Sequence, residues 1–262
     1  AMVAHPAVRR VNFTGSTRVG RIIGQTCAKY LKPVVLELGG KAPLLVLDDA
    51  DIDAAVAGTV FGAFANSGQI CMSTERIIVD VTVAEAFVAQ LARRAAALPA
   101  SLLGPVVDMK TVTRCNALIE DALAKGARLL AGGLSDSTQM RATLLDGVTR
   151  EMRIWHEESF GPVKSIIRVK DEAEALAVAN ESEYGLSSAI YSRDSARAWN
   201  LAQNLQTGIC HINGPTVHDE AQMPFGGVKN SGYGHFGGQA GIDAFTDTRW
   251  ITVQTQPRAY PF

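Results

Sequence analysis

The stretch Pro33–Leu47 reads PVVLELGGKAPLLVL and places two apolar runs on either side of an ELGGK segment. The runs Pro33–Leu36 and Leu44–Leu47 are short and rich in Val and Leu, which is typical of buried strands. The two glycines between them let the backbone turn sharply and approach another group closely. The stretch therefore predicts two buried strands, with a carboxylate, Glu37, at the end of the first.

The same alternation of strand-like and helix-like segments continues in both directions. Upstream, the strand-like residues Val8–Phe13 precede the helix-like residues Thr17–Leu31, and downstream the apolar residues of Ile52–Phe64 recur every fourth position. Further predicted strands are Arg76–Val79, Arg128–Leu130, Val163–Val169, Ser188–Tyr191 and Ile209–Ile212. Further predicted helices are Val83–Leu98, Val112–Lys125, Glu172–Asn180 and Ser195–Leu205. This alternation predicts an α/β fold with a mostly parallel sheet.

The C-terminal part of the chain has a different pattern. The stretch Met223–Gly241 is dense in glycine and is predicted to be a long ordered loop. Beyond it, polar and apolar residues alternate over Arg249–Thr255, which predicts an exposed strand.

The overall composition favours a globular protein with a small-molecule partner. Apolar residues make up 47% and charged residues 19% of the chain, which is ordinary for a globular protein. The 25 basic and 26 acidic residues give a formal charge of −1, so no net field holds nucleic acid or an anionic membrane. No apolar run reaches the ~18 residues of a membrane span. We expect a soluble, cytoplasmic protein that binds neither nucleic acid nor membranes.

The four cysteines, Cys27, Cys71, Cys115 and Cys210, form no CxxC pair and no metal-ligand spacing with the five histidines. We therefore expect reduced thiols, no disulfide and no metal site. Cys71 follows a predicted helix and lies close to Gly68, which indicates a loop, where a deprotonated thiol is a strong nucleophile. The alternative is a small buried residue. That second interpretation is the one we adopt for the other three cysteines.

Three further segments place polar groups where chemistry is possible. Burial of Glu37 would raise its pKa and make it a general base, whereas the alternative is an ion pair with a nearby Lys or Arg. Thr14–Ser16 lies between a strand and a helix, where free N–H groups favour a phosphate, although an ordinary capped turn fits equally well. Glu158 and Phe160 precede a Gly-Pro turn, where they could hold a ribose and flank a ring, or form a capped turn around a core Phe.

The segments FTGSTRVG, ELGGK, GQIC, EESFGPV, YGLS and PFGGVKNSG occur in this order across nearly the entire chain. In their order and separations they resemble the NAD(P)-dependent aldehyde dehydrogenase superfamily. The longer segments GQICMSTERIIVD and GPTVHDEAQMPFGGVKNSGYG are most similar to the salicylaldehyde, vanillin and benzaldehyde dehydrogenases. The resemblance implies an NAD cofactor, with NADP possible, and oxidation of a small aromatic aldehyde to its carboxylic acid.

The resemblance also implies roles for individual residues. Cys71 is expected to be the nucleophile that forms a thiohemiacetal and then a thioester, and Glu37 the base that activates the hydrolytic water. The residues expected near the cofactor are Gly15 and Ser16 at the pyrophosphate, Leu38 and Phe160 at the nicotinamide, and Glu158 at a ribose. The residues expected at the rim of the aldehyde pocket are Ile70, Met72, Val217 and Phe225. Asn213 is expected to help hold the catalytic loop.

The family's chains are nearly twice as long, and the half that supplies most of the dinucleotide-binding fold is absent ahead of Ala1. The resemblance divides the chain into a remnant of the cofactor domain (residues 1–38), a catalytic domain (39–241) and a C-terminal oligomerisation strand (242–262). Most cofactor contacts and an oxyanion-binding Asn would belong to the absent half. We therefore expect a homo-oligomer, dimer or tetramer, for the full-length enzyme and no dehydrogenase turnover by these residues alone. Two alternatives stay open, a cofactor-independent thiol esterase and an inactive, self-associating subdomain.

Overall fold

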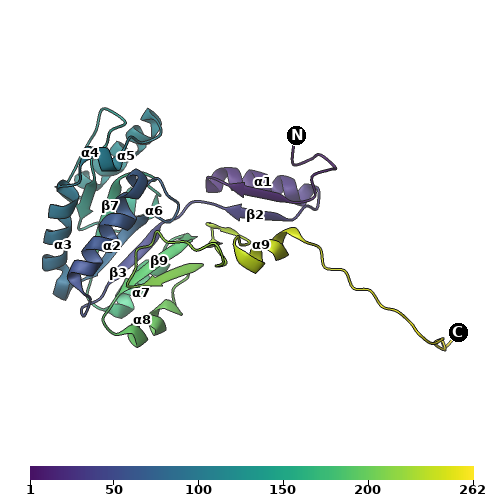
Figure 1. Ribbon diagram of the computed structural model, residues 1–262. Helices are drawn as coiled ribbons and strands as arrows, with labels where there is room; N and C mark the ends of the chain where they lie inside the picture. Colours follow the sequence, from purple (N-terminus) through teal and green to yellow (C-terminus); the bar gives the residue numbers. More distant parts are fainter.

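A seven-stranded sheet forms the centre of the larger lobe of the molecule. The computed structural model describes all residues, 1–262, and shows this sheet flanked by helices (Figure 1). In spatial order its strands are β10 (Ile209–Ile212), β9 (Ser187–Tyr191), β3 (Ala42–Val46), β4 (Thr74–Asp80), β7 (Val163–Val169), β6 (Thr143–Asp146) and β5 (Arg128–Ala131). Neighbouring strands are parallel except for β5 and β6. The predicted α/β class with a mostly parallel sheet is confirmed.

Helices cover both faces of this sheet, because successive side chains of a strand point to opposite faces. On β3, Leu44 packs on the side of α2 (Ile52–Phe64) and α3 (Val81–Ala96), whereas Leu45 packs on the other side. That other face carries α5 (Met109–Ala124), α6 (Arg153–His156), α7 (Glu172–Asn180) and α8 (Ser195–Ala202). Burial on both faces explains why the sequence of β3 is apolar at every position.

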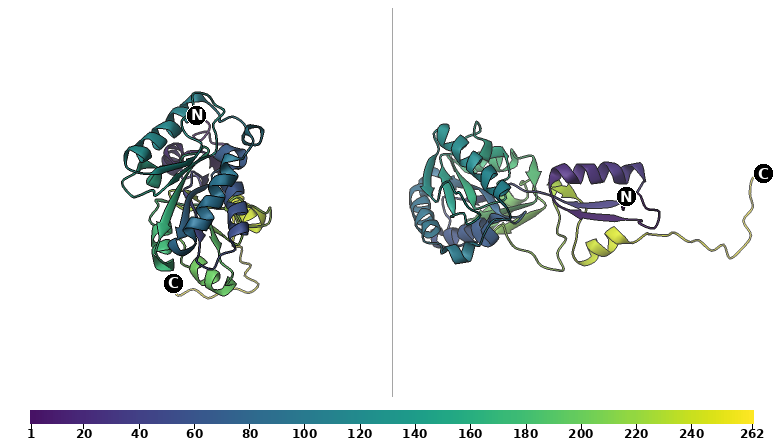
Figure 2. Two further views of the ribbon diagram at one scale, coloured as in Figure 1. Left: turned by 90° about the vertical axis from the view of Figure 1, so that its left-hand side faces the viewer. Right: turned by 90° about the horizontal axis from the view of Figure 1, so that it is seen from above.

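A three-stranded sheet forms the smaller lobe and carries Glu37. Strand β2 (Val34–Glu37) lies between β1 (Val11–Thr14), which is parallel to it, and β12 (Gly232–Tyr233), which is antiparallel. Helix α1 (Thr17–Lys29) connects β1 to β2 and lies along one face of these strands (Figure 2). The chain then leaves β2, passes through the two glycines and enters β3, so the ELGGK segment joins the two sheets.

The C-terminal part of the chain returns to the smaller lobe. Strand β11 (Val228–Lys229) pairs with β8 (Tyr184–Gly185) just before the chain reaches β12. Helix α9 (Gly238–Phe245) is fastened to the N-terminal segment by Arg10, whose Nη1 donates to the Ala244 carbonyl at 2.8 Å. The proposed domain boundaries at residues 38 and 241 stay predictions, although β12 groups with the N-terminal strands in space.

Two predictions for the C-terminal part are wrong. Met223–Gly241 is not a loop throughout, because it contains β11, β12 and the start of α9, and two-residue strands leave no periodic signal. Arg249–Thr255 forms no strand, and the chain beyond α9 extends away from the rest of the molecule (Figure 1). A strand is stable when another strand satisfies its backbone groups, and no segment of this chain pairs with these residues. The proposed oligomerisation role of residues 242–262 stays a prediction.

Two further short helices, α4 (Ala100–Leu103) and the 3-10 helix η1 (Ala65–Gly68), lie at one end of the larger lobe. No helix is both long enough and apolar enough to cross a membrane.

We predict that the larger lobe depends on the packing of α5 against the sheet. Leu118 is fully buried, whereas Leu123 on the same helix is 38% exposed. Leu118→Ala should lower the free energy of unfolding by about 2–5 kcal/mol, because it removes buried methyl groups and leaves a cavity. Leu123→Ala should change it by less than about 0.5 kcal/mol. Urea unfolding followed by circular dichroism measures both values, and equal losses in the two variants would contradict this packing.

Candidate active site

Glu37 ends β2 and is the most unusual carboxylate in the molecule. Its side chain is only 3% exposed, and neither carboxylate oxygen has a hydrogen-bond partner. Burial raises the pKa of Glu37 to about 7, because water no longer stabilises the charged form. The ion pair considered as the alternative does not form. Glu37 is therefore a carboxyl group that can take up or release a proton near neutral pH.

The Gly39–Gly40 segment brings the end of β2 against two other loops, although the sharp turn expected there does not form. A Cβ added at Gly40 would lie 2.3 Å from the carbonyl oxygen of Cys71, and one added at Gly39 would lie 2.5 Å from Oε2 of Glu158. A side chain at Gly40 would collide with backbone, and one at Gly39 would displace the Glu158 carboxylate. The predicted close approach of this segment to another group is therefore confirmed, and it joins the segments of Glu37, Cys71 and Glu158 in one place.

A strained turn presents Cys71 after α2. Asn66, Ser67 and Gly68 have φ values of 50°, 56° and 70°, a left-handed conformation that non-glycine residues rarely adopt. The turn is held from outside, because Ser67 Oγ donates to the Gly104 carbonyl at 3.0 Å. Cys71 follows with intermediate exposure. The predicted presentation of this thiol on a loop, rather than in the core, is confirmed.

The thiol of Cys71 is electrostatically coupled to both carboxylates. Burial is the main cause that raises the pKa of Cys71 to about 11, and the negative charges of Glu37 and Glu158 raise it further. At neutral pH the sulfur therefore carries its proton and needs a base to become a nucleophile. Cys27 and Cys115 are buried, as expected for structural residues, and all four cysteines are free thiols.

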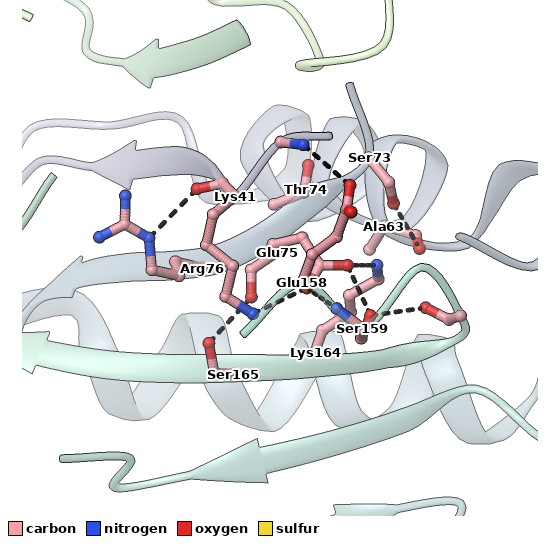
Figure 3. Close-up of polar contacts among 12 residues, drawn as sticks. Lys41, Ala63, Ser73, Thr74, Glu75, Arg76, Glu158, Ser159, Lys164 and Ser165 are labelled. Carbon is pink, nitrogen blue, oxygen red and sulfur yellow. Dashed lines mark hydrogen bonds and ion pairs between the residues drawn. The ribbon is translucent and has the colours of Figure 1, made fainter. Parts of the chain in front are cut away.

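Glu158 and Phe160 flank the other side of the Gly39–Gly40 segment. The backbone N–H of Gly40 donates to Glu158 Oε1 at 2.8 Å, while burial raises the pKa of Glu158 to about 7 (Figure 3). Phe160 is exposed and has a φ of 42°, so it is not the core residue of the alternative interpretation. A half-buried carboxylate beside an exposed ring, held in an unfavourable backbone conformation, is typical of a ligand-binding position.

The strand-to-helix turn before α1 lies next to the same place. The backbone N–H of Gly15 donates to the carbonyl of Glu37 at 2.9 Å. Ser16 caps α1 by accepting a hydrogen bond from Val19 N at 3.4 Å. Ser16 is thus the capping residue of the ordinary interpretation, but the exposed helix end can still receive a phosphate. Leu38 is buried, and its N–H donates to the Ser231 carbonyl at 3.0 Å.

The predicted rim of the aldehyde pocket is only partly assembled. Ile70 and Met72 flank Cys71 in sequence, and Met72 is buried. Phe225 lines a cavity of about 390 Å³ together with residues 208–211 and 218–220, but Val217, Ile70 and Met72 do not line it. The assignment of these four residues to one substrate pocket stays a prediction.

Asn213 lies at the end of β10. Its side-chain oxygen accepts the backbone N–H of Ser192 at 3.0 Å, so it ties the end of β10 to the end of β9. Support of the Cys71 loop by Asn213 stays a prediction.

Sequence reasoning missed a buried charged cluster beside the site. Glu75 on β4 is paired with Lys41 and with Lys164 at 2.8 Å each, and Ser159 also binds it (Figure 3). The sequence does carry a signal for this cluster, because charged residues such as Glu75 and Lys164 within buried strands need partners of opposite charge. The predicted strand began at Arg76, which left Glu75 outside it.

Comparison with known proteins gives this site a family. The model of the aldehyde dehydrogenase family matches residues 1–251. Vanillin dehydrogenase of Pseudomonas fluorescens is 61% identical, over 99% of this chain and 55% of that protein. A Pseudomonas putida protein named as an NAD(+) benzaldehyde dehydrogenase is 42% identical, over 100% of this chain and 55% of that protein.

Solved structures agree with the sequences. The crystal structure of a salicylaldehyde dehydrogenase from Pseudomonas putida G7, complexed with salicylaldehyde, matches with a TM-score of 0.97 and 49% identity. The match covers 100% of this chain and 56% of the salicylaldehyde dehydrogenase chain. This chain therefore spans about half the length of the relatives that it matches. With the family match extending from the first residue to beyond α9, the chain belongs to the aldehyde dehydrogenase family and is homologous to its NAD(P)-dependent members.

Proposed function

We propose that this chain carries the catalytic thiol and the catalytic base of an NAD(P)-dependent dehydrogenase that oxidises aromatic aldehydes to carboxylic acids. The observation that supports it most is the meeting of two groups around one Gly-Gly segment. The carboxylate of Glu37 is buried without a partner, and the backbone of Gly40 lies against that of Cys71. A thiol and a free carboxylate are the nucleophile and the base that oxidation through a thioester requires.

The reaction begins when Cys71 loses its proton and its sulfur adds to the aldehyde carbon. A C–S bond forms and the carbonyl π electrons move to oxygen, giving a thiohemiacetal whose oxyanion needs preorganised donors such as the Cys71 N–H. The thiol proton passes to a nearby base, and Glu37 is free to accept it because no hydrogen bond occupies its oxygens. When bound, NAD(P)+ supplies the hydride acceptor that the oxidation requires.

Once Glu37 has passed the thiol proton on to solvent, its carboxylate activates the water that releases the acid. The water loses a proton to the carboxylate and attacks the thioester, a C–O bond forms, and the C–S bond breaks with the electron pair returning to sulfur. Because burial raises the pKa of Glu37 to about 7, the ionised form that acts as a base gains population as the pH rises through about 7. Acid release should therefore become faster over that range.

The residues around the Gly39–Gly40 segment fit one end of a dinucleotide. Gly15 and Ser16 directly precede α1, and the N-terminal end of a helix attracts a phosphate. Glu158 would hold a ribose hydroxyl, and the exposed ring of Phe160 and the backbone of Leu38 would contact the nicotinamide. The remaining cofactor contacts would come from the part of the relatives that this chain does not match.

The names of the relatives support an aromatic substrate. The three relatives described above are named for vanillin, benzaldehyde and salicylaldehyde, which share an aldehyde on an aromatic ring. A second candidate function, hydrolysis of activated esters, is favoured by one observation. Cys71 and Glu37 both lie within this chain and need no cofactor for that reaction.

We predict that the 262-residue chain alone forms no NADH with benzaldehyde and NAD+, because most of the cofactor site and one oxyanion donor are missing. One such donor is worth about a hundred- to a thousandfold in rate. Joining the chain to the upstream segment of Pseudomonas fluorescens vanillin dehydrogenase gives an extended protein, in which NADH formation should appear. Absorbance at the NADH band measures both, with a chromogenic ester assayed in parallel. Sustained NADH formation by the chain alone would contradict the proposal that most cofactor contacts come from the part of the relatives that this chain does not match.

In the extended protein we predict that Cys71→Ala abolishes aldehyde oxidation, because no nucleophile remains. Glu37→Gln should instead accumulate the acyl-enzyme, since the thioester forms but water is not activated. Intact-mass spectrometry after mixing with benzaldehyde and NAD+ distinguishes the two variants by the acyl adduct. Cys115→Ala is the matched control and should retain turnover. Normal turnover in either active-site variant would refute the role assigned to that residue.

Glu37→Gln should also stabilise the fold, in a way that depends on pH. The folded-state pKa of Glu37 is raised to about 7 from 4.5, so the wild-type protein is penalised as the pH rises above about 4.5, and fully above about 7. The variant should gain on the order of 1–3 kcal/mol at pH 9 and nothing below pH ~4. Urea unfolding at both pH values measures the difference. A variant that is less stable than wild type at pH 9 would show that the carboxylate has a favourable partner.

A further inference from the structure

The buried cluster around Glu75 lies beside three segments of the proposed site, those of Gly40, Glu158 and Cys71. Glu75 lies on β4, four residues after Cys71, and is almost fully buried. Its Oε2 accepts from Lys41 Nζ at 2.8 Å and from the backbone N–H of Ser159 at 2.9 Å. Its Oε1 accepts from Lys164 Nζ at 2.8 Å and from the Ser159 hydroxyl at 2.5 Å. Figure 3 shows these side chains converging on one carboxylate.

The Glu75 carboxylate stays ionised although it is buried. Burial alone would raise the pKa of Glu75, but the charges and hydrogen bonds of Lys164 and Lys41 outweigh burial and lower it to about 2. Four hydrogen bonds to one buried carboxylate fix its position, because losing any partner leaves an unpaired charge in the interior. Glu75 is therefore a rigid point inside the larger lobe.

Two of these contacts hold the two sides of the Glu158 hydrogen bond. Lys41 directly follows Gly40, which is the donor to Glu158 Oε1 at 2.8 Å, and Ser159 directly follows Glu158, the acceptor. Glu75 binds Lys41 and Ser159 through the same oxygen, Oε2. Glu75 thus holds the residue next to the donor Gly40 and the residue next to the acceptor Glu158. Its carboxylate thereby sets the distance between the Gly40 N–H and Glu158 Oε1.

The third contact reaches the turn that presents the thiol. A Cβ added at Gly68 would lie 2.3 Å from the Gly161 carbonyl and 3.0 Å from Lys164 Nζ. Lys164 therefore lies beneath the turn before Cys71 and beside the loop that carries Phe160. Arg76 strengthens the arrangement from below, because its Nε donates to the Lys41 carbonyl at 3.2 Å.

We propose that Glu75 is a positioning residue for the cofactor side of the site: through Lys41 and Ser159 it holds the Glu158 carboxylate and the Phe160 ring at a fixed place relative to Gly40 and Cys71. The inference rests on the proposed function, in which Glu158 and Phe160 contact the cofactor. It assigns to Glu75 no contact with substrate or cofactor. Its removal should loosen the Glu158 loop and weaken cofactor binding, while the thiol remains reactive.

The test compares Glu75→Gln with Ser165→Ala in the extended protein. Ser165 is the matched control, because its buried hydroxyl also binds Glu75, at 2.8 Å, but through the backbone carbonyl rather than the carboxylate. Glu75→Gln should raise the KM for NAD+ by about tenfold or more, because the loss of one charge-assisted hydrogen bond weakens binding by about that factor. The rate of Cys71 alkylation by iodoacetamide should stay within about twofold. Ser165→Ala should change neither quantity by more than about twofold.

Hydrogen exchange supplies a readout that needs no activity. The Gly40 amide should exchange about tenfold faster in Glu75→Gln than in wild type, because its acceptor is no longer held, and should be unchanged in Ser165→Ala. If Gly40 protection depends on Glu75 but the wild-type protein reduces no NAD+, the positioning role stands and the proposed function fails. If NAD+ is reduced but Glu75→Gln matches Ser165→Ala in both exchange and KM, the proposed function stands and the positioning role is wrong.

A milder variant keeps the test decisive if Glu75→Gln does not fold. Lys164→Met removes one of two ammonium groups and leaves Lys41 and Glu75 as a neutral pair that still binds Ser159. Ser159→Ala removes the hydroxyl alone. Each should raise the KM for NAD+ by about three- to tenfold with alkylation of Cys71 unchanged. Unchanged KM values in both would overturn the inference.

Discussion

The structure depends on one constraint, the close approach of the Gly39–Gly40 segment to the segments of Cys71 and Glu158. A side chain at Gly40 would collide with the backbone of Cys71, and one at Gly39 would displace the Glu158 carboxylate. The Gly39–Gly40 segment also carries the chain from the smaller sheet to the larger one, so it fixes the two lobes against each other at the same point. The five residues Glu37–Lys41 therefore connect the two sheets and also contain the proposed base.

Two buried carboxylates beside this segment are held in opposite states. Glu75 is satisfied by two lysines and by Ser159, and the pKa of its carboxyl falls to about 2 despite burial. Glu37 has no partner, and burial raises its pKa to about 7. The paired group is suited to holding structure and the unpaired one to moving a proton, because only the latter changes charge near neutral pH. An unpaired buried charge costs stability, which is the usual sign of a functional residue.

The sequence predicted most strands of the larger sheet, because periodic segments carry that information locally, whereas the roles of Cys71 and Glu37 stay predictions. It did not predict β6, nor the strands β11 and β12, whose two residues each are too few to show a period. The prediction of a strand over Arg249–Thr255 was wrong because the alternation of residues within a segment does not show whether another strand pairs with it. The Glu75 cluster escaped notice because its members lie up to 89 residues from Glu75 in sequence and meet only in the fold.

The proposed chemistry requires that Cys71 and Glu37 lie close enough for the charge of one to act on the other. The most direct measurement is the rate of Cys71 alkylation as a function of pH, followed by peptide mass spectrometry in wild type and in Glu37→Gln. Burial and the two nearby carboxylates raise the thiol pKa to about 11, so removing the Glu37 charge should lower the apparent pKa and speed alkylation at pH 8–9. Superimposable profiles for the two proteins would mean that the sulfur and the carboxylate do not share a site.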